Sequence, residues 1–149
     1  MSGQTLVIER TFQAPAQRVF DAWTSAEVMR RWFHAEHHWH TPTAEVDLRL
    51  GGNVRVVMRD PDKGTEYGGG GHYTEIDPPH RLAFTWTWDE EPDRETRIEL
   101  DFEEAEGATK VRLTHSNLRD RESVISHEDG WSNCLDNLGR ALDQEQPAM

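Results

Sequence analysis

Basic residues are scarce in this chain of 149 residues. Its length is that of one domain, which we expect to span residues 1–149 with a core of about 4–143. It has 16 Lys and Arg against 28 Asp and Glu, a formal net charge of −12 at pH 7. Proteins that bind nucleic acids or anionic membrane surfaces usually present a basic face to the phosphates. We therefore expect neither a nucleic acid nor a membrane among its partners.

Cysteine and long apolar runs are also nearly absent. Cys134 is the single cysteine, so no intrachain disulfide can form, and a chain without disulfides is typical of a reducing compartment. No apolar stretch approaches the roughly 20 residues that span a bilayer. The first residues carry neither the basic patch nor the apolar run of a signal peptide. These absences predict a cytoplasmic protein.

The sequence lacks the glycine and nucleophile motifs of several large enzyme families. It has no Gly-x-Ser-x-Gly, no phosphate-binding loop and no dinucleotide-binding fingerprint. The glycine run 68–71 is followed by His72 rather than by Lys and Ser or Thr, so it does not fit a phosphate loop. Glycines within a strand mark a bulge or a close approach, and they would equally leave room for a ligand beside His72. We expect no cofactor.

The residues that are present predict one strand and two short helices at the start of the chain. Residues 6–12 alternate as in a strand, and Val19 and Trp23 then recur at helical spacing. Residues 24–27, Thr-Ser-Ala-Glu, match a capping box with Thr24 as the N-cap of a second helix.

From about residue 44 the pattern changes to a period of two, which predicts about six antiparallel strands joined by short turns. Val46, Leu48 and Leu50 open this series. Helical spacing returns over residues 127–142, which carry one apolar stripe. A sheet with one apolar face needs a cover, and this helix is the largest element available. The predicted fold class is therefore α+β, a curved antiparallel sheet of six or seven strands wrapped around a long C-terminal helix.

The faces of sheet and helix that are predicted to meet are rich in aromatic and histidine side chains. Large flat apolar groups with a few polar atoms are typical of a small-molecule cavity, although a solid core with hydrogen-bonded histidines would show the same stripe. We expect a small apolar or aromatic ligand there. The candidate ligand-binding residues are Trp32, Phe33, His38, Met58, His72, Phe84, Trp86, Trp88, His115, His127, Trp131 and Cys134.

The densest histidine cluster is the segment 34–40, His-Ala-Glu-His-His-Trp-His. His38 and His40 would share one face of a strand, whereas His34 and His38 would share one face of a helix. Zinc needs three or four such ligands, and a third would have to come from Glu36 or from a distant residue. We expect no metal and interpret the segment as a loop at the mouth of the cavity. If a metal did bind, His34, His38 and His40 would be the candidate ligands.

Motifs in a fixed order run through nearly the whole chain. They lie at residues 8–12, 14–15, 19–24, 31–33, 47–52, 58–62, 73–82, 84–86, 130–132, 135–136 and 138. In these motifs the chain resembles the START-like (SRPBCC) superfamily, in the bacterial subgroup named for homology to the activator of heat-shock protein 90 ATPase. The resemblance implies the helix-grip (Bet-v-1-like) fold, with a cavity for hydrophobic ligands such as lipids, polyketides or flavonoid-like aromatics. The histidine cluster and the glycine run depart from the family pattern.

Three functions are compatible with these patterns. The first is a binding module for a small apolar or aromatic ligand. The second is a cyclase or hydrolase with His72, His115 or His127 as general acid or base. We interpret Cys134 as a small buried apolar residue rather than as a nucleophile. The third, stimulation of the ATPase of heat-shock protein 90, rests on the family name alone. We also expect that a homodimer can form, because small symmetric dimers are common.

Overall fold

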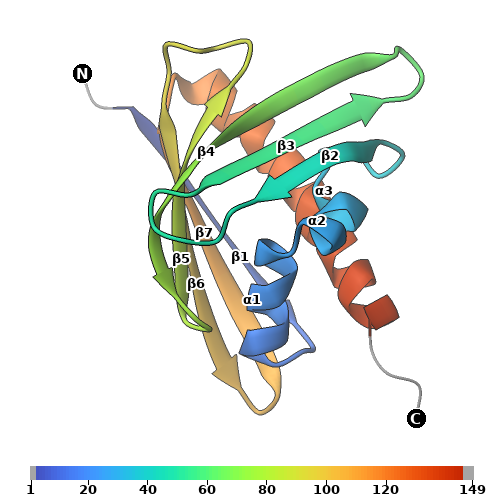
Figure 1. The fold of residues 1–149 in the computed structure, drawn as a ribbon, viewed down its shortest axis with the longest axis vertical. Helices are drawn as coiled ribbons and strands as arrows, with labels where there is room; N and C mark the ends of the chain where they lie inside the picture. The colour runs from blue at the N-terminus through green and yellow to red at the C-terminus, as the bar shows by residue number, and fades with distance from the viewer. Residues whose placement is uncertain (1–2, 146–149) are drawn as a thin grey trace.

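The computed structural model describes residues 3–145, which form seven strands and three helices (Figure 1). The strands are β1 Gln4–Phe12, β2 His40–Val46, β3 Asn53–Asp60, β4 Thr65–Asp77, β5 Arg81–Trp88, β6 Thr96–Ala105 and β7 Ala108–Leu118. The helices are α1 Ala16–Thr24, α2 Ala26–Trp32 and α3 Arg121–Glu145. Among the described residues, no helix combines the length and the apolar character needed to cross a membrane.

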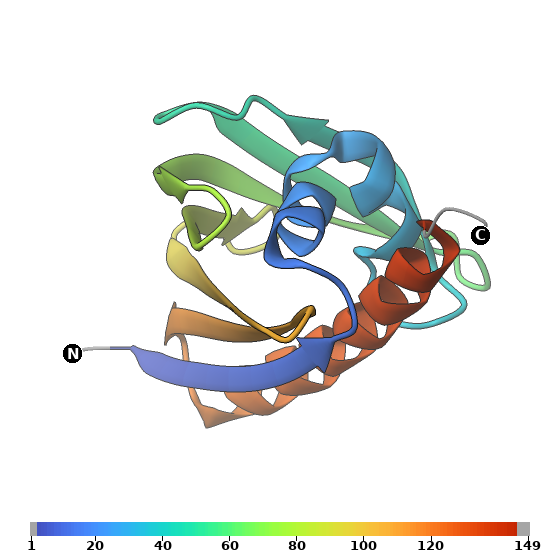
Figure 2. The same ribbon diagram turned by 90° about the horizontal axis from the view of Figure 1, so that it is seen from below.

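All seven strands form one antiparallel sheet in the order β1-β7-β6-β5-β4-β3-β2. Strands β2 to β6 each pair with the next strand along the chain, and β1 completes the sheet beside β7. The sheet is strongly curved, and the three helices lie on its concave side (Figure 2). The predicted α+β fold, a curved sheet around a long C-terminal helix, is confirmed.

The core lies between the concave face of the sheet and the helices. Ile98 and Leu100 alternate with charged residues along β6 and are fully buried, and Leu135 and Leu138 on α3 are buried with them in the same core cluster. Each such side chain stabilises the fold by about 1.5–3 kcal/mol relative to an exposed position. The strict alternation along β6 fixes which face of this strand meets the helices.

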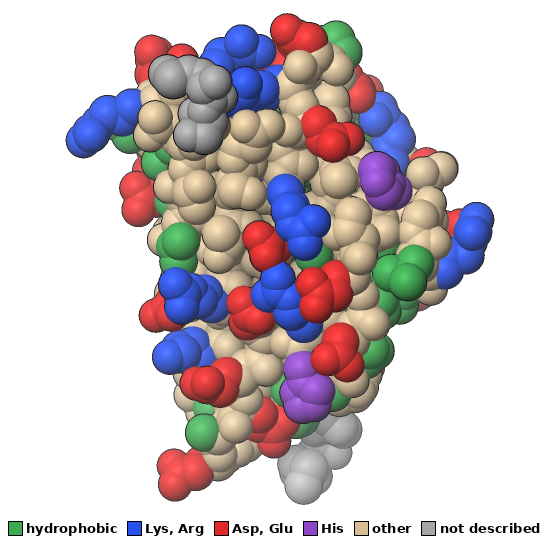
Figure 3. All heavy atoms as spheres, turned by 90° about the vertical axis from the view of Figure 1, so that its left-hand side faces the viewer, with side chains coloured by type: hydrophobic (Ala, Val, Ile, Leu, Met, Phe, Trp, Pro, Cys, Tyr) green, Lys and Arg blue, Asp and Glu red, His purple; other side chains and the backbone are tan. Residues whose placement is uncertain are grey.

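The opposite face of the sheet is polar. Arg81 on β5 lies between carboxylates of the two neighbouring strands, at 2.8 Å from Glu75, 2.7 Å from Asp101 and 2.5 Å from Glu99. Acidic and basic side chains are interspersed on the side of the molecule shown in Figure 3, with few hydrophobic ones among them. This side therefore offers no extended apolar patch.

The second helix begins one residue later than the sequence predicts. Thr24 is the last residue of α1, and its hydroxyl donates to the carbonyl of Phe20 at 3.1 Å. Ser25 is the N-cap of α2, and its hydroxyl accepts from the Val28 amide at 3.3 Å. The capping-box prediction with Thr24 as N-cap is wrong because two adjacent hydroxyl residues compete for that position and α1 uses the first.

The strand predicted to include Leu48 and Leu50 ends earlier, at Val46. The two leucines are 42% and 67% exposed. The chain turns there instead. The Asp47 amide donates to the Asn53 carbonyl at 2.9 Å, and the Gly52 amide donates back to the Arg49 carbonyl at 2.8 Å. Gly51, with φ of 80°, supplies a left-handed turn residue that most side chains would not adopt.

Candidate functional site

A pocket of about 590 Å³ lies between the inner face of β4 and β5 and the first half of α3. Its volume is within the range of roughly 300–1,000 Å³ that is usual for small-molecule sites. Its walls consist mainly of the rings of Phe33, Trp39, Tyr67, Trp86, Trp88, His115, His127 and Trp131. The remaining lining residues are Ala35, Met58, Glu90, Glu91, Ser123, Ser126, Gly130 and Cys134. We call this site the aromatic pocket.

The rings of the aromatic pocket pack against one another in a continuous wall. Phe33 stacks on Trp86 with centroids 5.6 Å apart and meets Trp131 edge-on at 5.4 Å. Trp86 meets Trp88 edge-on at 5.3 Å. Such pairs hold one another in fixed orientations, so the wall presents preformed flat surfaces to the space that it encloses.

The four-glycine run of β4 brings the sheet backbone close to this wall. A Cβ atom on Gly69 would lie 2.7 Å from the indole ring of Trp86, and one on Gly71 would lie 2.1 Å from the carbonyl oxygen of Thr85. The first contact is with a buried, stacked ring and the second is with backbone, so neither neighbour can move cheaply. The glycines therefore serve the close approach that the sequence predicts, and Gly69 lets Trp86 lie against the sheet.

His115 is buried in the pocket wall with both ring nitrogens bonded. The Thr96 hydroxyl donates to the Trp86 carbonyl at 2.7 Å, so it can only accept from His115 Nε2 at 2.8 Å. His115 Nδ1 then accepts from the indole N–H of Trp131 at 3.1 Å. Burial, with a smaller contribution from the nearby imidazole of His127, lowers the pKa of His115 to about 3. His115 is therefore neutral, with its proton on Nε2.

His127 lies next to His115 in the pocket wall and has a similarly fixed pattern. Its Nε2 accepts from the indole N–H of Trp88 at 3.0 Å. Its Nδ1 donates to the Ser123 carbonyl one turn earlier on α3, at 2.7 Å. The two imidazoles meet edge-on with centroids 4.9 Å apart. Neither histidine keeps a free lone pair in this arrangement, so neither can accept a proton without breaking a bond to a tryptophan.

One end of the aromatic pocket is polar and reaches the solvent. Glu90 and Glu91 lie in the turn that follows β5, and Ser126 adds a hydroxyl from α3. Glu91 accepts from Arg119 Nε at 2.6 Å, whereas the Glu90 carboxylate has no ion pair or hydrogen bond within residues 3–145. The two carboxylate residues that line the pocket are thus both acidic, and no Lys or Arg of the described residues lines it.

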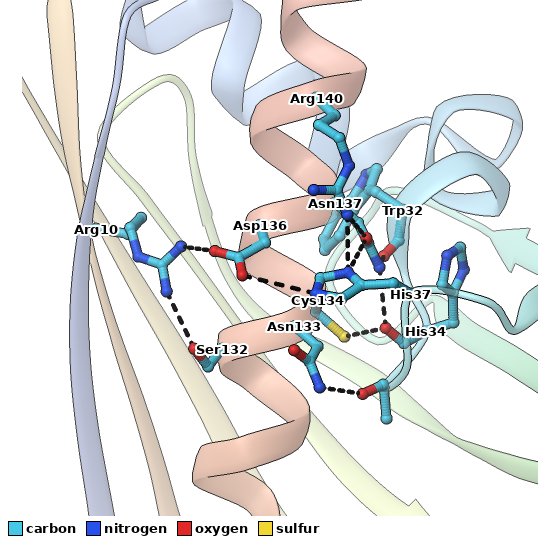
Figure 4. A network of polar contacts seen from close by, with 11 residues as sticks. Arg10, Trp32, His34, His37, Ser132, Asn133, Cys134, Asp136, Asn137 and Arg140 are labelled. Atoms are coloured by element: carbon cyan, nitrogen blue, oxygen red, sulfur yellow. Dashed lines mark hydrogen bonds and ion pairs between the residues drawn. The ribbon is translucent and has the colours of Figure 1, made fainter.

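Helix α3 fixes the loop that follows α2 (Figure 4). The amide of Asn133 donates to the Ala35 carbonyl at 2.8 Å, and the amide of Asn137 donates to the His34 carbonyl at 3.3 Å. On the same helix, Asp136 pairs with Arg10 of β1. The bonds from Asn133 and Asn137 satisfy loop carbonyls inside the protein and hold Phe33 and Ala35 in the pocket wall.

Cys134 belongs to the same set of contacts. Its thiol donates to the His34 carbonyl at 3.2 Å, and burial raises the pKa of the Cys134 thiol far above its usual range. A thiolate is the reactive form of cysteine, so Cys134 acts here as a small wall residue.

The histidine cluster does not converge on one point. His34 is buried and donates from Nδ1 to the Thr41 hydroxyl at 3.1 Å, because that hydroxyl itself donates to the Phe33 carbonyl at 2.7 Å. Burial, followed by the neighbouring His40, lowers the pKa of His34 to about 4. His40 is exposed on β2. Hence the three metal candidates of the sequence are not brought together.

His38 lies instead beside the turn between β3 and β4, away from the aromatic pocket. Its Nε2 is 3.4 Å from the carboxylate of Asp62, and one ligand atom each of His38, Asp60 and Asp62 fall within 4.8 Å of one another. Asp60 already accepts from the Asp62 and Lys63 amides, at 2.9 and 3.4 Å. Asp60 therefore caps this turn, and His38 makes one exposed contact with Asp62.

Three further predicted residues lie outside the pocket wall. Trp32 is deeper in the core, where its N–H donates to the Ala22 carbonyl at 3.1 Å. Phe84 is fully buried against Trp86, with centroids 6.3 Å apart. Alternation along β4 places His72 on the face opposite the pocket, where it is exposed. The structure brings together Phe33, Met58, Trp86, Trp88, His115, His127, Trp131 and Cys134.

The sequence prediction missed the remaining lining residues for two reasons. Tyr67 shares the inner face of β4 with Gly69, two residues on, so alternation through the glycine run would have found it. Ser123 and Gly130 fall on the same α3 stripe as His127, and small residues on an apolar stripe leave space beside it. Trp39 and the two glutamates lie in loops, where no periodicity applies.

Comparison with solved structures finds the same fold in bacterial proteins. A protein from Rhizobium leguminosarum is 32% identical, with 95% of each chain covered and a TM-score of 0.79. An AHSA1 protein from Silicibacter pomeroyi is 28% identical over 96% of this chain and all of its own, with a TM-score of 0.84. A protein from Chromobacterium violaceum shares the fold at 19% identity and a TM-score of 0.86, over 93% of this chain and 97% of its own. No protein with a curated description matches this sequence.

The family comparison covers nearly all of the elements described above. The sequence model of "Activator of Hsp90 ATPase homolog 1-like protein" matches residues 13–143, from the end of β1 to the last turns of α3. This agrees with the resemblance seen in the sequence and with the curved sheet around α3. The chain belongs to the Activator of Hsp90 ATPase homolog 1-like family.

Proposed function

We propose that this protein binds a small, flat, apolar or aromatic molecule in the aromatic pocket. The observation that carries the proposal is a preformed space of about 590 Å³ whose wall includes eight rings. Burying apolar ligand surface there would contribute about 25 cal/mol for each Å² removed from water. The ring orientations are already fixed, so binding would cost little reorganisation.

A hydrolase or cyclase with a histidine base has less support. In the pocket, His115 and His127 each have both nitrogens engaged, and His72 lies on the other face. A general base needs a free lone pair within hydrogen-bond reach of its substrate. The histidines are better explained as acceptors that hold the indole rings of Trp88 and Trp131 in place.

The test is a titration with N-phenyl-1-naphthylamine, an uncharged aromatic probe whose fluorescence rises in apolar surroundings. Gly130 lines the pocket on α3, and a Cβ atom there would lie 3.4 Å from Ala35. Gly130→Leu fills this space, so we expect it to weaken probe binding by about tenfold or more, because the pocket loses the area that would be buried.

Gly139→Leu is the matched control. Gly139 is on the same helix but outside the pocket, with its nearest neighbour, Phe12, at 3.8 Å from a Cβ atom. Both variants exchange a helical glycine for a better helix former, and thermal melts check that both fold. An equal affinity of the two variants, or the absence of binding to the wild type, would contradict the proposal.

A further inference from the structure

The charged residues that line the aromatic pocket are all acidic. No Lys or Arg is among its described lining residues, and Glu90 and Glu91 both stand at its open end. Arg119 neutralises Glu91 by the ion pair at 2.6 Å. The Glu90 carboxylate is left without a partner in the described part of the chain.

The interior of the pocket adds no positive charge. His115 is held neutral by its bonds to Thr96 and Trp131. His127 would have to give up its bond from Trp88 in order to become charged. An anionic ligand would therefore leave water without gaining any cationic partner, which is costly.

The same wall suits a cation. The faces of indole rings carry negative potential and attract ammonium groups, most strongly where water is excluded. Trp86, Trp88 and Trp131 supply three indoles to the same pocket wall as Glu90. The chain as a whole carries a formal charge of −12, which favours the approach of cations from solution.

We infer that the ligand of the aromatic pocket is a planar aromatic amine in its protonated form, with its rings between the tryptophans and its charged nitrogen toward Glu90. This inference rests on the proposed function and narrows it to one class of ligand. It assigns Glu90 as a specificity-determining residue that selects cations over neutral and anionic molecules of the same shape.

The experiment compares three fluorescent tricyclic probes that differ in charge: 9-aminoacridine as the cation, acridone as the neutral molecule and 9-anthracenecarboxylate as the anion. Fluorescence anisotropy gives the dissociation constant of each. We expect 9-aminoacridine to bind about tenfold tighter than acridone and the anion to bind most weakly. Glu90→Gln should raise the dissociation constant of 9-aminoacridine by about threefold to tenfold. The dissociation constant of acridone should not change.

Glu95→Gln is the matched control. It removes the same charge from the loop before β6, at an exposed residue that is not in the pocket wall. Acridone binding that equals or exceeds that of 9-aminoacridine would overturn the inference. An equal effect of the two substitutions would also overturn it, because only the net charge would then matter.

The failure of this inference and the failure of the proposed function give different results. One outcome is that acridone binds, that Gly130→Leu abolishes its binding, and that 9-aminoacridine binds no tighter than acridone. In that case the pocket binds ligands without the charge preference inferred here. If none of the three probes binds, or if binding ignores Gly130→Leu, the proposed function itself fails.

Discussion

His115 and His127 are titratable residues that the fold uses as parts of an apolar wall. Each accepts an indole N–H on one nitrogen and donates from the other. This arrangement satisfies two indole N–H groups and four imidazole nitrogens inside the protein. The tautomers are fixed by the partners, because Thr96 and Ser123 leave only one direction for each proton.

The buried histidines predict a loss of stability in acid. The pKa of His115 is lowered to about 3 and that of His34 to about 4, against 6.5 in the unfolded chain. The unfolded state therefore binds more protons below pH 6.5. The stability that these residues contribute is complete above that pH and falls as the pH drops toward 4.

For each unit by which the pH falls in this window, each histidine should lower the free energy of unfolding by about 1 kcal/mol. Urea unfolding at pH 7, 6 and 5 measures this slope. The ring resonances of His115 in NMR spectra provide an independent check, since they should keep the chemical shifts of neutral imidazole at pH 5. A stability that is constant from pH 7 to 5, or a protonated His115 at pH 5, would contradict the assignment.

Cys134 gives a second prediction at the scale of one residue. Because the thiol is buried and its pKa is raised, we expect the native protein to react with 5,5′-dithiobis(2-nitrobenzoate) at least about a hundredfold more slowly than the chain in guanidinium chloride. Absorbance of the released thiolate measures both rates. Rapid reaction of the native protein would indicate an accessible thiol and would reopen a catalytic role.

At the scale of the element, the glycine run of β4 determines where the pocket wall lies. Gly69→Ala places a methyl group 2.7 Å from the Trp86 ring, so the ring must move toward the pocket. We expect a loss of about 1–3 kcal/mol in the free energy of unfolding, with weaker probe binding. Urea unfolding and the probe titration measure the two effects.

Gly68→Ala is the control in the same strand. Its Cβ atom would meet the end of the exposed Asp89 side chain at 2.6 Å, which can swing away. Alanine is also better than glycine in a strand, so we expect a change of less than about 1 kcal/mol. Equal losses for the two variants would show that the run serves the strand backbone and not Trp86.

Periodicity was sufficient to predict the elements and the part of the site that lies on regular structure. Trp86 and Trp88 alternate along β5, and Trp131 and Cys134 fall on the α3 stripe, so their approach to one another follows from the fold. Leu48 shows the limit, because the alternation continues through a segment whose backbone bonds form a turn.

Residues in loops could not be assigned in this way. Trp39 reaches the pocket from the loop before β2, and its ring lies parallel to that of Tyr67 at 5.2 Å. His38 comes from the same loop but meets the β3–β4 turn. Such positions depend on tertiary contacts such as the bond from Asn133 to the Ala35 carbonyl, which no local pattern encodes.

At the scale of the whole molecule, the strongly acidic composition and the aromatic pocket point to the same class of small molecule. The sheet buries its apolar face against the helices, yet the side chains beside β4, β5 and α3 leave a space unfilled. A stable domain does not need this space, because close packing gives the greater stability. Homodimer formation stays a prediction.

The most direct test of this account is the set of indole N–H signals in a ¹H–¹⁵N NMR spectrum, recorded with and without acridone. Of the six tryptophans, Trp39, Trp86, Trp88 and Trp131 line the aromatic pocket, whereas Trp23 and Trp32 are buried outside it. We predict that acridone shifts the four lining signals and affects the other two least. Shifts largest at Trp23 and Trp32, or no shifts at saturating probe, would contradict the claim that this pocket binds flat aromatic molecules.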